Sequence, residues 1–465
     1  MTELFADMAL LPDGWAADVM LRWDGAGRLI EVTPDAGAVA NGTPRAPGPV
    51  VPGMTNLHSH SFQRAMAGRA ETRGDPAVTG GDESFWTWRE AMYRLALMLE
   101  PEDATVIARH LAVECLMRGY TGICEFHYLH RDPNGAAYED PAEMSLAVVS
   151  GLREAGIAVT HLPVLYSRGG FDDAPLNPRQ KRFKGSAKSM LAIVERVRAA
   201  FAGDPCVRVG LAPHSVRAAP PKAIADAVRA LAKLDETAPI HIHIAEQEKE
   251  VADCLAATGH RPVTLLSETV GIDARWCLVH ATHLDVAEIA LLAQSGAVAG
   301  LCPITEANLG DGLFPITAYL AAGGRLGIGS DSHVSRDPTR ELALLEYGAR
   351  LTAKRRNRLA GPESPSVGGT LWPLAAAGGG QAAGRKTGRI EIGASADLVA
   401  LDREHPDIAE RQGDQVLDGW LFAADSNPVE DVYVGGDRVV ADSHHPHQVE
   451  ARTAYRRLLA RLFHE

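Results

Sequence analysis

The segment Asn56-Leu57-His58-Ser59-His60 places two histidines two residues apart, directly after the apolar run Val50 to Met54. Side chains on a β-strand alternate between its two faces, so His58 and His60 point the same way and one metal ion can take both imidazoles. A chain with 18 histidines places two of them at this spacing by chance fairly often. Alone, such a pair is structural about as often as it binds metal, so the rest of the chain decides its meaning.

Three further apolar, strand-like runs end in residue types that bind metal or carry protons. They are Ile240 to Glu246, which contains His241 and His243, then Leu278 to His280, and then Ile328 to Asp331. Together with the first run, this makes four strand ends that carry histidine or carboxylate, which is hard to explain by core histidines. The pattern predicts a metal-dependent hydrolase.

We predict that His58, His60, His243 and Asp331 bind one metal ion. Three imidazoles and one carboxylate suit Zn²⁺, although the type of ligand alone leaves Fe²⁺ open. His241 and His243 lie on the same face of their strand, so periodicity does not separate them. We favour His243 because it lies nearer the strand end, and expect His241 to pack beneath the site.

Three residues could move protons beside the ion. Glu246 lies where its strand opens into the next loop and could carry a proton to a leaving nitrogen. Without the preceding histidine it would be interpreted as a solvated glutamate at a charged helix start. Asp331 could accept a proton from a water that the ion activates, and His280 could hydrogen-bond that water or the developing alkoxide. His283 is expected to be structural.

A second group of residues concerns the substrate. His214 and Arg217 follow the predicted strand 207–213, and Arg89 lies near two tryptophans in the long connection after the first strand. An arginine in such a place is more often a packed surface residue. However, two arginines at one barrel mouth are what a dicarboxylate needs, because guanidinium groups bind carboxylates in a fixed orientation. Gln63 and Tyr128 could add further contacts.

The elements that position these residues alternate between strand and helix from residue 50 to 355, in eight β-α units. The expected strands after the first are 121–128, 157–165, 207–213, 239–245, 276–280, 298–303 and 325–330, and the helices are 102–118, 141–155, 187–201, 221–234, 247–257, 286–294, 315–322 and 340–351. Such alternation implies parallel strands with right-handed crossovers, and eight of them close a (β/α)8 TIM barrel. An open doubly wound sheet would not gather residues from strands 1, 5, 6 and 8 around one point.

The two ends of the chain look different from the middle. Both contain short apolar segments broken by Gly and Asp, such as 17–23, 388–393, 396–402 and 432–436, which suggest strands. We predict that residues 1–49 and 387–445 form one small discontinuous β-sandwich domain beside a barrel of residues 50–386. The Gly- and Ala-rich stretch 360–385 is a connector or helical return, and residues 446–465 form a C-terminal helix.

Composition excludes several classes of function. The formal net charge of −13 opposes a nucleic-acid partner, because binding to a phosphate backbone draws on clustered Lys and Arg. No apolar stretch approaches the ~20 residues that span a membrane, and Met1 to Phe5 show no secretory signal. The six cysteines contain no Cys-x-x-Cys pair, which fits reduced thiols in a cytoplasm. We expect no membrane partner.

Taken together, the motifs resemble the mononuclear deaminase branch of the amidohydrolase superfamily and, within it, the formiminoglutamate deiminases. The resemblance covers essentially the full chain. Its most specific segments are Phe85-Trp86-Thr87-Trp88-Arg89 and His214-Ser215-Val216-Arg217, whereas the barrel motifs are shared with many deaminases. Further matching stretches are 56–64, 241–247, 276–283, 301–311 and 329–333, with Gly393 to Val399 in the small domain.

By this resemblance, one zinc ion per subunit is held by the four predicted ligands, and His280 lies beside the reacting water without binding the metal. Glu246, His280 and Asp331 are the implied catalytic residues. The residues implied to bind the two substrate carboxylates are Gln63, Arg89, Tyr128, His214 and Arg217. The implied reaction hydrolyses N-formimino-L-glutamate to N-formyl-L-glutamate and ammonia in histidine degradation, in a cytoplasmic homodimer.

Other interpretations stay open at this level. A deaminase of a ring substrate such as guanine, or a relative that opens imidazolonepropionate, would use the same metal ligands but would not need two arginines. A non-catalytic homologue would normally lack a ligand, and none is missing here. A phosphodiester nuclease is disfavoured by the charge. Activity on formiminoaspartate, and which arginine binds which carboxylate, are not decided by these patterns.

Overall fold

A barrel of parallel strands forms the larger part of the molecule. The computed structural model describes residues 2–37, 40–72 and 85–464, with only the backbone at 85–87. The barrel strands are β5 (Met54–Ser59), β6 (Tyr120–His127), β7 (Ala158–Leu165), the split strand β8 (Val207–Val209) and β9 (Ala212–Pro213), β10 (Ile240–Ile244), β11 (Trp276–His280), β12 (Val298–Leu301) and β13 (Arg325–Ile328).

Hydrogen bonding divides these strands into two parallel sheets, β5 to β8 and β10 to β13. Isolated parallel bridges join the sheets at both seams: Leu211 pairs with Ile240, and Ser59 pairs with Asp331. The eight strand positions therefore follow one another around a closed ring, and the predicted (β/α)8 barrel is confirmed. The second bridge brings the first strand directly beside the end of the last one.

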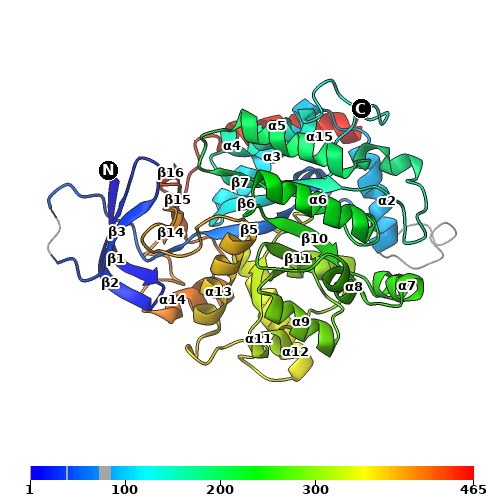
Figure 1. Cartoon of the computed structure of the whole chain (residues 1–465). Helices are drawn as coiled ribbons and strands as arrows, with labels where there is room; N and C mark the ends of the chain where they lie inside the picture. The colour runs from blue at the N-terminus through cyan, green and yellow to red at the C-terminus, as the bar shows by residue number, and fades with distance from the viewer. Residues whose placement is uncertain (1, 38–39, 73–84, 465) are drawn as a thin grey trace.

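Helices surround this ring (Figure 1). They are α2 (Phe85–Ala96), α3 (Pro101–Leu116), α4 (Glu143–Glu154), α5 (Ala187–Ala200), α6 (Pro221–Leu234), α7 (Glu248–Thr258), α8 (Pro262–Thr269), α9 (Val286–Ser295), α10 (Pro303–Leu309), α11 (Ile316–Ala321), α12 (Pro338–Ala353) and α13 (Val367–Ala382), with 3-10 turns η1 (Ser61–Met66) and η2 (Pro178–Phe183). Helix α11, although only six residues long, was predicted at 315–322, whereas the short helices α8 and α10 were not predicted. Each begins with proline, whose fixed φ suits the first helical position.

Strands from both ends of the chain form the second part of the molecule, at the left in Figure 1. They are β1 (Thr2–Leu11), β2 (Gly14–Trp23), β3 (Leu29–Thr33), β4 (Val50–Pro52), β14 (Leu398–Leu401), β15 (Val429–Val434) and β16 (Asp437–Val440). Their order in the sheet is β16-β15-β14-β4-β1-β2-β3. The ends of the sequence therefore meet through β4 at the centre of one sheet.

This sheet folds over on itself. Four strand spacings separate β2 from β15, which would be about 19 Å in a flat sheet. Nevertheless, the rings of Trp23 on β2 and Tyr433 on β15 lie edge to face with centroids 6.0 Å apart. The two halves enclose their own hydrophobic cluster, which includes Leu21 and Leu398. A sandwich built from both termini, as predicted, is the result.

Two details differ from the predicted organisation. Strand β4 (Val50–Pro52) pairs with β1 and β14 of the small sheet, so that sheet extends past the expected boundary at residue 49. The segment 388–393 was expected to be a strand but forms turns. Gly393 has φ +86 and donates its N–H to the carbonyl of Leu29, so the chain bends where a strand would continue.

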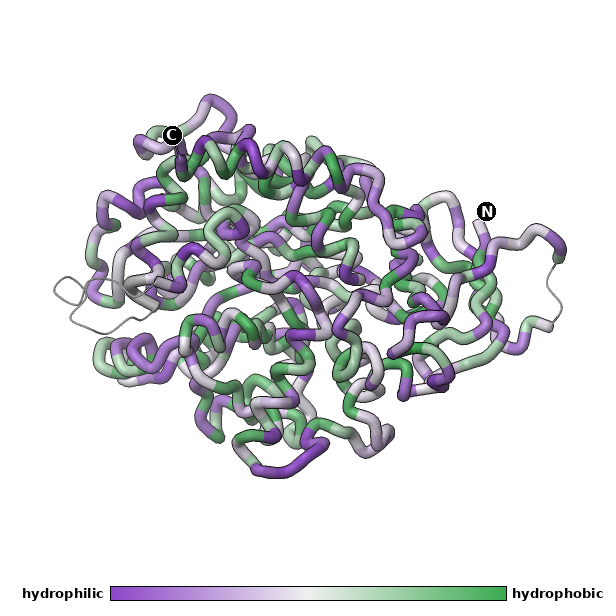
Figure 2. Tube along the Cα trace, turned by 180° about the vertical axis from the view of Figure 1, so that it is seen from behind, coloured by the Kyte–Doolittle hydropathy of each residue, from purple (hydrophilic) through white to green (hydrophobic). Residues whose placement is uncertain are grey.

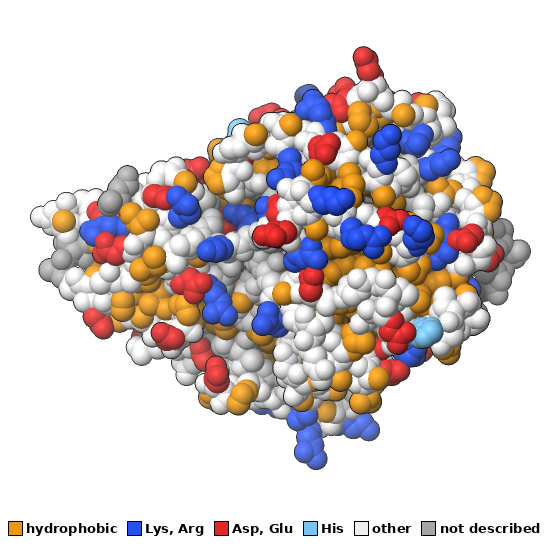
Figure 3. Space-filling model, viewed as in Figure 1, with side chains coloured by type: hydrophobic (Ala, Val, Ile, Leu, Met, Phe, Trp, Pro, Cys, Tyr) orange, Lys and Arg blue, Asp and Glu red, His pale blue; other side chains and the backbone are white. Residues whose placement is uncertain are grey.

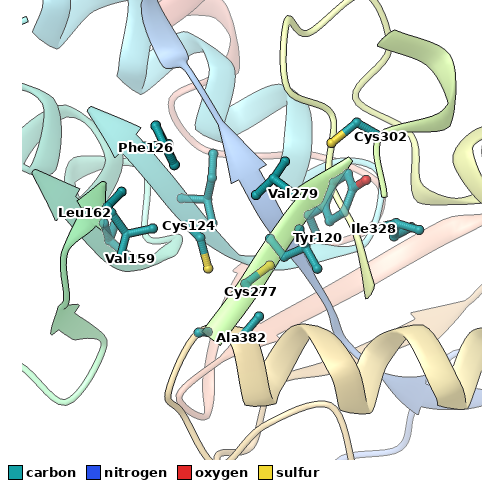
Figure 4. Packing of buried hydrophobic residues seen from close by; sticks show 14 of the residues in the cluster. Tyr120, Cys124, Phe126, Val159, Leu162, Cys277, Val279, Cys302, Ile328 and Ala382 are labelled. Carbon is teal, nitrogen blue, oxygen red and sulfur yellow. The ribbon is translucent and has the colours of Figure 1, made fainter. Parts of the chain in front are cut away.

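The hydrophobic core of the barrel lies between the strands and the surrounding helices. Figure 4 shows Phe126, Val279 and Ile328 packed together with the thiol-bearing side chains of Cys124 and Cys277. The outer helices alternate between hydrophobic and hydrophilic residues along their length (Figure 2). Helix α13 closes the barrel from below, and the indole of Trp372 donates to the carbonyl of Pro52 at 3.1 Å.

The remaining helices, α14 (Asp414–Phe422) and α15 (Gln448–His464), follow the barrel, and α15 lies at the upper edge of Figure 1. On the face shown in Figure 3, Lys and Arg are interspersed with Asp and Glu. All six cysteines lie in the described ranges, where they are buried and form no disulfide. Within those ranges, none of the helices has the length and apolar character needed to cross a bilayer.

Candidate active site

The predicted metal ligands meet at the carboxyl ends of the barrel strands. His58 lies near the end of β5 and His60 directly after it, His243 lies in β10, and Asp331 follows β13. Parallel strands end at the same rim of a barrel, so residues far apart in sequence converge there. The bridge between Ser59 and Asp331 brings the first and last strands together at this point.

The ligand atoms lie close enough to surround one ion. The Nε2 atoms of His58 and His243 are 3.0 Å apart, and Asp331 Oδ1 lies 3.5 Å from Nε2 of both His58 and His60. Ligands bound to Zn²⁺ at 2.0–2.1 Å in a tetrahedron are about 3.3 Å from one another. These three distances are compatible with a small divalent ion, and the side chains whose ligand atoms lie close together are His58, His60 and Asp331 on one side and His58, His243 and His280 on the other.

Hydrogen bonding supports the same interpretation. His60 donates from Nδ1 to the carbonyl of Phe126 at 2.7 Å, which leaves its Nε2 as the free lone pair. His58 is fully buried, and its Nδ1 has no hydrogen-bond partner among the described residues. Two imidazole nitrogens facing each other at 3.0 Å, beside a carboxylate, are a donor set that a cation stabilises. The residues present thus fit a metal ion.

A buried polar network holds the segment that carries the two histidines. The carboxylate of Glu125 accepts hydrogen bonds from the Ser59 hydroxyl at 2.6 Å and from the backbone N–H and hydroxyl of Ser61 at 2.8–3.1 Å. His333 contacts the hydroxyls of Ser59 and Ser330 at 3.1 and 2.8 Å. The residues on either side of His60 are therefore fixed from strand β6, and the first strand is tied to the last.

His280 lies among three carboxylates. Its Nε2 is 3.6 Å from Glu246 Oε1 and 3.9 Å from Asp331 Oδ2, while its Nδ1 is 3.3 Å from Glu306 Oε1. Glu306 also accepts the backbone N–H of Cys302 at 2.8 Å, so it is itself held in place. Burial works against a charge on His280, but Glu246, Glu306 and Asp331 together raise its pKa to about 10.

Glu246 is suited to carry a proton near neutral pH. Burial raises the pKa of its carboxyl group to about 7, with a further contribution from Asp331, although the His280 charge opposes it. A group with a pKa near the working pH is the most effective acid and base. Burial also raises the pKa of the Asp331 carboxyl group.

The backbone at this rim is locally strained. Ala245, His280 and Asp331, each at or just after a strand end, have φ values of +50, +66 and +46. Non-glycine residues rarely adopt this left-handed conformation, and its cost is tolerated mainly where surrounding structure holds a functional group in place. The backbone N–H of Asp331 donates to the carbonyl of His58 at 2.9 Å, which fixes the turn.

A cavity opens beside these residues and contains the predicted substrate-binding side chains. Its wall includes Gln63, Arg89, Tyr128, His214 and Arg217, and also every other predicted site residue except the fully buried His58. The amide of Gln63 donates to the hydroxyl of Tyr128 at 2.8 Å. The structure thus brings the metal-type site and two arginines together around one space.

His241 and His283, which we did not expect to bind the metal, lie outside the cavity. His241 lies on the same face of β10 as His243 but one layer deeper, where its Nε2 donates to the carbonyl of Ala382 at 2.8 Å. This imidazole therefore packs against helix α13 and hydrogen-bonds it, as expected for a residue beneath the site. His283 does not line the cavity.

Several residues of the site were not singled out from the sequence. Glu306, which contacts His280, lies in the short helix α10; Tyr93 and Tyr166 line the cavity, and Gln180 hydrogen-bonds both tyrosines. Tyr93 follows Arg89 by four residues, the spacing of one helix face, so the helical periodicity of α2 was an available signal. Tyr166 directly follows the end of β7, which was also an available signal, whereas Gln180 lies in the short 3-10 turn η2, which no sequence pattern indicated.

Family models match the chain in two parts. The amidohydrolase family matches residues 50–439, and the N-terminal domain of formimidoylglutamate deiminase HutF matches residues 1–45. The formimidoylglutamate deiminase of Pseudomonas aeruginosa is 50% identical over 464 residues, which cover 99% of this chain and 100% of that protein. A 5-methylthioadenosine/S-adenosylhomocysteine deaminase of Natronomonas pharaonis is 28% identical over 84% of this chain and 81% of its own.

Solved structures agree on the fold. An amidohydrolase from Brucella melitensis superposes with a TM-score of 0.92 at 42% identity, over 99% of this chain and all of that one. An adenosine deaminase from Xanthomonas campestris with bound zinc superposes with a TM-score of 0.78 at 21% identity, over 100% and 99% of the two chains, which shows the fold alone. This chain belongs to the amidohydrolase family and, within it, to the formimidoylglutamate deiminases.

Proposed function

We propose that this enzyme hydrolyses the formimino group of N-formimino-L-glutamate, giving N-formyl-L-glutamate and ammonia, in histidine degradation. The observation that carries the proposal is one cavity with a His/Asp metal-type site at one end and Arg89 and Arg217 in its wall. The substrate has matching parts, namely one formimino carbon and two carboxylates. The name of the 50% identical relative supports the same substrate.

His58, His60, His243 and Asp331 are proposed to hold one Zn²⁺ per subunit. When bound, such an ion supplies a Lewis acid that lowers the pKa of a water molecule and makes it a nucleophile at neutral pH. The distances of 3.0 Å from His58 to His243 and of 3.5 Å from Asp331 to His58 and to His60, with the free Nε2 of His60, support this assignment. Zinc in the name of the Xanthomonas campestris structure is consistent with it.

The protein groups are then proposed to move protons in a fixed order. Asp331 accepts a proton from the attacking water, whose oxygen forms a bond to the formimino carbon. Glu246, with a pKa near 7, carries a proton to the nitrogen that leaves, and the C–N bond breaks to release ammonia. His280 donates a hydrogen bond to the oxygen on which charge develops.

Gln63, Arg89, Tyr128, His214 and Arg217 are proposed to bind the two carboxylates. Guanidinium groups supply paired donors with the geometry of a carboxylate, and their charge favours an anionic ligand. Ring substrates such as guanine carry no carboxylate for the two arginines to bind, which argues for the linear substrate.

We also propose, from the family resemblance, that the enzyme is a cytoplasmic homodimer. Six buried cysteines without a disulfide fit a reducing compartment. A small dicarboxylate is the proposed partner, and neither nucleic acid nor a membrane is proposed. Light scattering at several protein concentrations would measure the oligomeric state.

The first experiment is product analysis. Protein stripped with a chelator and reloaded with Zn²⁺ is incubated with N-formimino-L-glutamate, and we expect ammonia and N-formyl-L-glutamate, with no turnover before reloading. Reloading with Fe²⁺ tests the choice of metal, and guanine serves as the ring substrate. Formamide and glutamate would mean that the other nitrogen leaves. Turnover of guanine alone would reject the proposed substrate.

A further inference from the structure

Gln180 has an amide orientation that its surroundings determine. It lies in η2, is 3% exposed, and its Oε1 is 3.0 Å from the backbone nitrogen of Asn177. A backbone N–H can only donate, so the atom facing it must be the amide oxygen. The amide nitrogen therefore faces the opposite way, toward the hydroxyl oxygens of Tyr93 at 3.1 Å and Tyr166 at 2.8 Å.

Both tyrosine hydroxyls consequently act as acceptors toward Gln180. The amide nitrogen carries two hydrogens and no lone pair for accepting, so it donates one hydrogen to each tyrosine. Tyr166 also receives a hydrogen bond from the guanidinium of Arg217, which fills the second acceptor position of its oxygen. Each hydroxyl still carries its own proton, and neither proton has an acceptor among the described residues.

These protons belong to the wall of the cavity. Tyr93 and Tyr166 line it together with Arg89 and Arg217. The guanidinium of Arg89 lies over the ring of Tyr93, 5.5 Å from its centroid. Arginine side chains only donate, and the two hydroxyls each have a proton to donate, so these four residues present mainly donors to a ligand. Of the acidic groups in the wall, Glu246 lies 3.6 Å from His280 and Asp331 lies 3.5 Å from His60.

We propose that Tyr93 and Tyr166 bind one carboxylate of the substrate, and that Gln180 positions their hydroxyls as donors so that the site selects carboxylate over carboxamide. A carboxylate offers four lone-pair positions and no hydrogen, which matches the donors of Arg89, Arg217 and the two tyrosines in this part of the wall. The NH2 group of a carboxamide would face these donors, so its hydrogens and theirs would stay buried without acceptors. The cost of such unpaired polar groups lets a site discriminate strongly between carboxylate and carboxamide. This inference rests on the proposed function for the identity of the substrate.

The first test uses isosteric loss of each hydroxyl. We expect Tyr93→Phe and Tyr166→Phe each to raise KM for N-formimino-L-glutamate about tenfold, because a hydrogen bond to a charged group is lost. The kcat should stay within about threefold, since the reacting carbon lies at the metal end. Tyr319→Phe is the matched control: that buried hydroxyl donates to the carbonyl of Arg325 outside the cavity, and its loss should leave KM unchanged.

The second test reverses the hydrogen bonds around position 180. In Gln180→Glu, the carboxylate accepts from both tyrosines, whose hydroxyls then turn lone pairs toward the cavity. The two monocarboxamide analogues of the substrate are compared with the dicarboxylate. We expect the wild-type preference for carboxylate at one of the two positions to fall at least about tenfold in Gln180→Glu, and to fall less in Gln180→Leu, which lets the hydroxyls turn either way.

Binding of glutarate separates this inference from the proposed reaction. Calorimetry with glutarate needs no turnover, and we expect both tyrosine variants to bind it about tenfold more weakly than wild type. If the tyrosine variants bind glutarate more weakly but the wild type releases no ammonia, the proposed reaction is rejected and the inference stands. The inference would be overturned if both tyrosine variants kept the KM and the glutarate affinity of the wild type. It would also be overturned if the wild type did not bind glutarate. In either case, release of ammonia would still support the proposed reaction. If Gln180→Glu does not fold, the two tyrosine variants decide.

Discussion

At the scale of single residues, the surroundings of Glu246 and His280 give the two side chains different pKa values. Glu246 and His280 lie 3.6 Å apart, and each alters the protonation of the other. Burial raises the pKa of Glu246 to about 7, whereas the surrounding carboxylates outweigh burial at His280 and raise its pKa to about 10. One group can therefore exchange a proton near neutrality while its neighbour keeps one.

The proton-carrying role of Glu246 is open to a direct test. Glu246→Gln keeps the size of the side chain but cannot exchange a proton, so we expect kcat to fall at least about a hundredfold. The zinc content should stay at one ion per chain, because Glu246 is not among the proposed ligands. Steady-state kinetics and elemental analysis measure both quantities. The exposed Glu248, two residues away, provides the control Glu248→Gln, and a near-normal kcat for Glu246→Gln would refute the assignment.

At the scale of elements, helix α13 shows how closely the barrel is packed from below. A Cβ atom added to Gly378 would lie 1.8 Å from the carbonyl oxygen of Leu326 in β13, a distance that only a backbone shift could relieve. The same helix accepts the imidazole of His241 at Ala382. The strands that carry the site therefore rest on a helix without room for a methyl group.

We expect Gly378→Ala to lower the free energy of unfolding by about 2–3 kcal/mol, because overpacking against backbone forces the helix away from the barrel. Urea or thermal unfolding followed by circular dichroism measures the loss. Gly25→Ala is the control, since a Cβ atom at that position would meet no atom within 4 Å. Equal stability of both variants would show that α13 can move without cost.

At the scale of the whole molecule, buried neutral histidines make stability depend on pH. His161 in β7 is fully buried, and both its ring nitrogens lack hydrogen-bond partners among the described residues. Burial, with the nearby His130, lowers its pKa to about 3. In the unfolded chain the pKa is about 6.5, so the unfolded state binds more protons between these values. Its contribution to stability is therefore present above pH 6.5 and is lost as the pH falls.

For wild type, this single group is expected to lower the free energy of unfolding by about 2 kcal/mol between pH 7.5 and pH 5. His161→Leu removes the titration, so the decline over that range should shrink by about the same amount. Urea unfolding at both pH values measures it, with His464→Leu at the exposed end of α15 as control. An identical decline in wild type and His161→Leu would contradict this explanation.

Much of the fold and the centre of the site could be predicted from sequence, because they depend on local periodicity. Strands alternate their faces, so His58 and His60 had to share one, and parallel strands end at one rim, so His243 and Asp331 had to join them. Most of the barrel helices were found for the same reason, but α2 and α14 were not predicted. The short helices α8 and α10 were missed although the six-residue α11 was found, so helix length alone does not explain these omissions.

The sequence by itself determined which strand ends carry histidine and carboxylate, and that the ends of the chain differ from the middle. Only the tertiary structure decided that Trp23 meets Tyr433 across the folded sheet, and that Glu306 reaches His280. It also decided that Gln180 joins Tyr93 to Tyr166. The physical reason is that these contacts join loops and strands whose separation depends on how the whole chain closes, and hydrogen-bond direction depends on partners that no local pattern specifies.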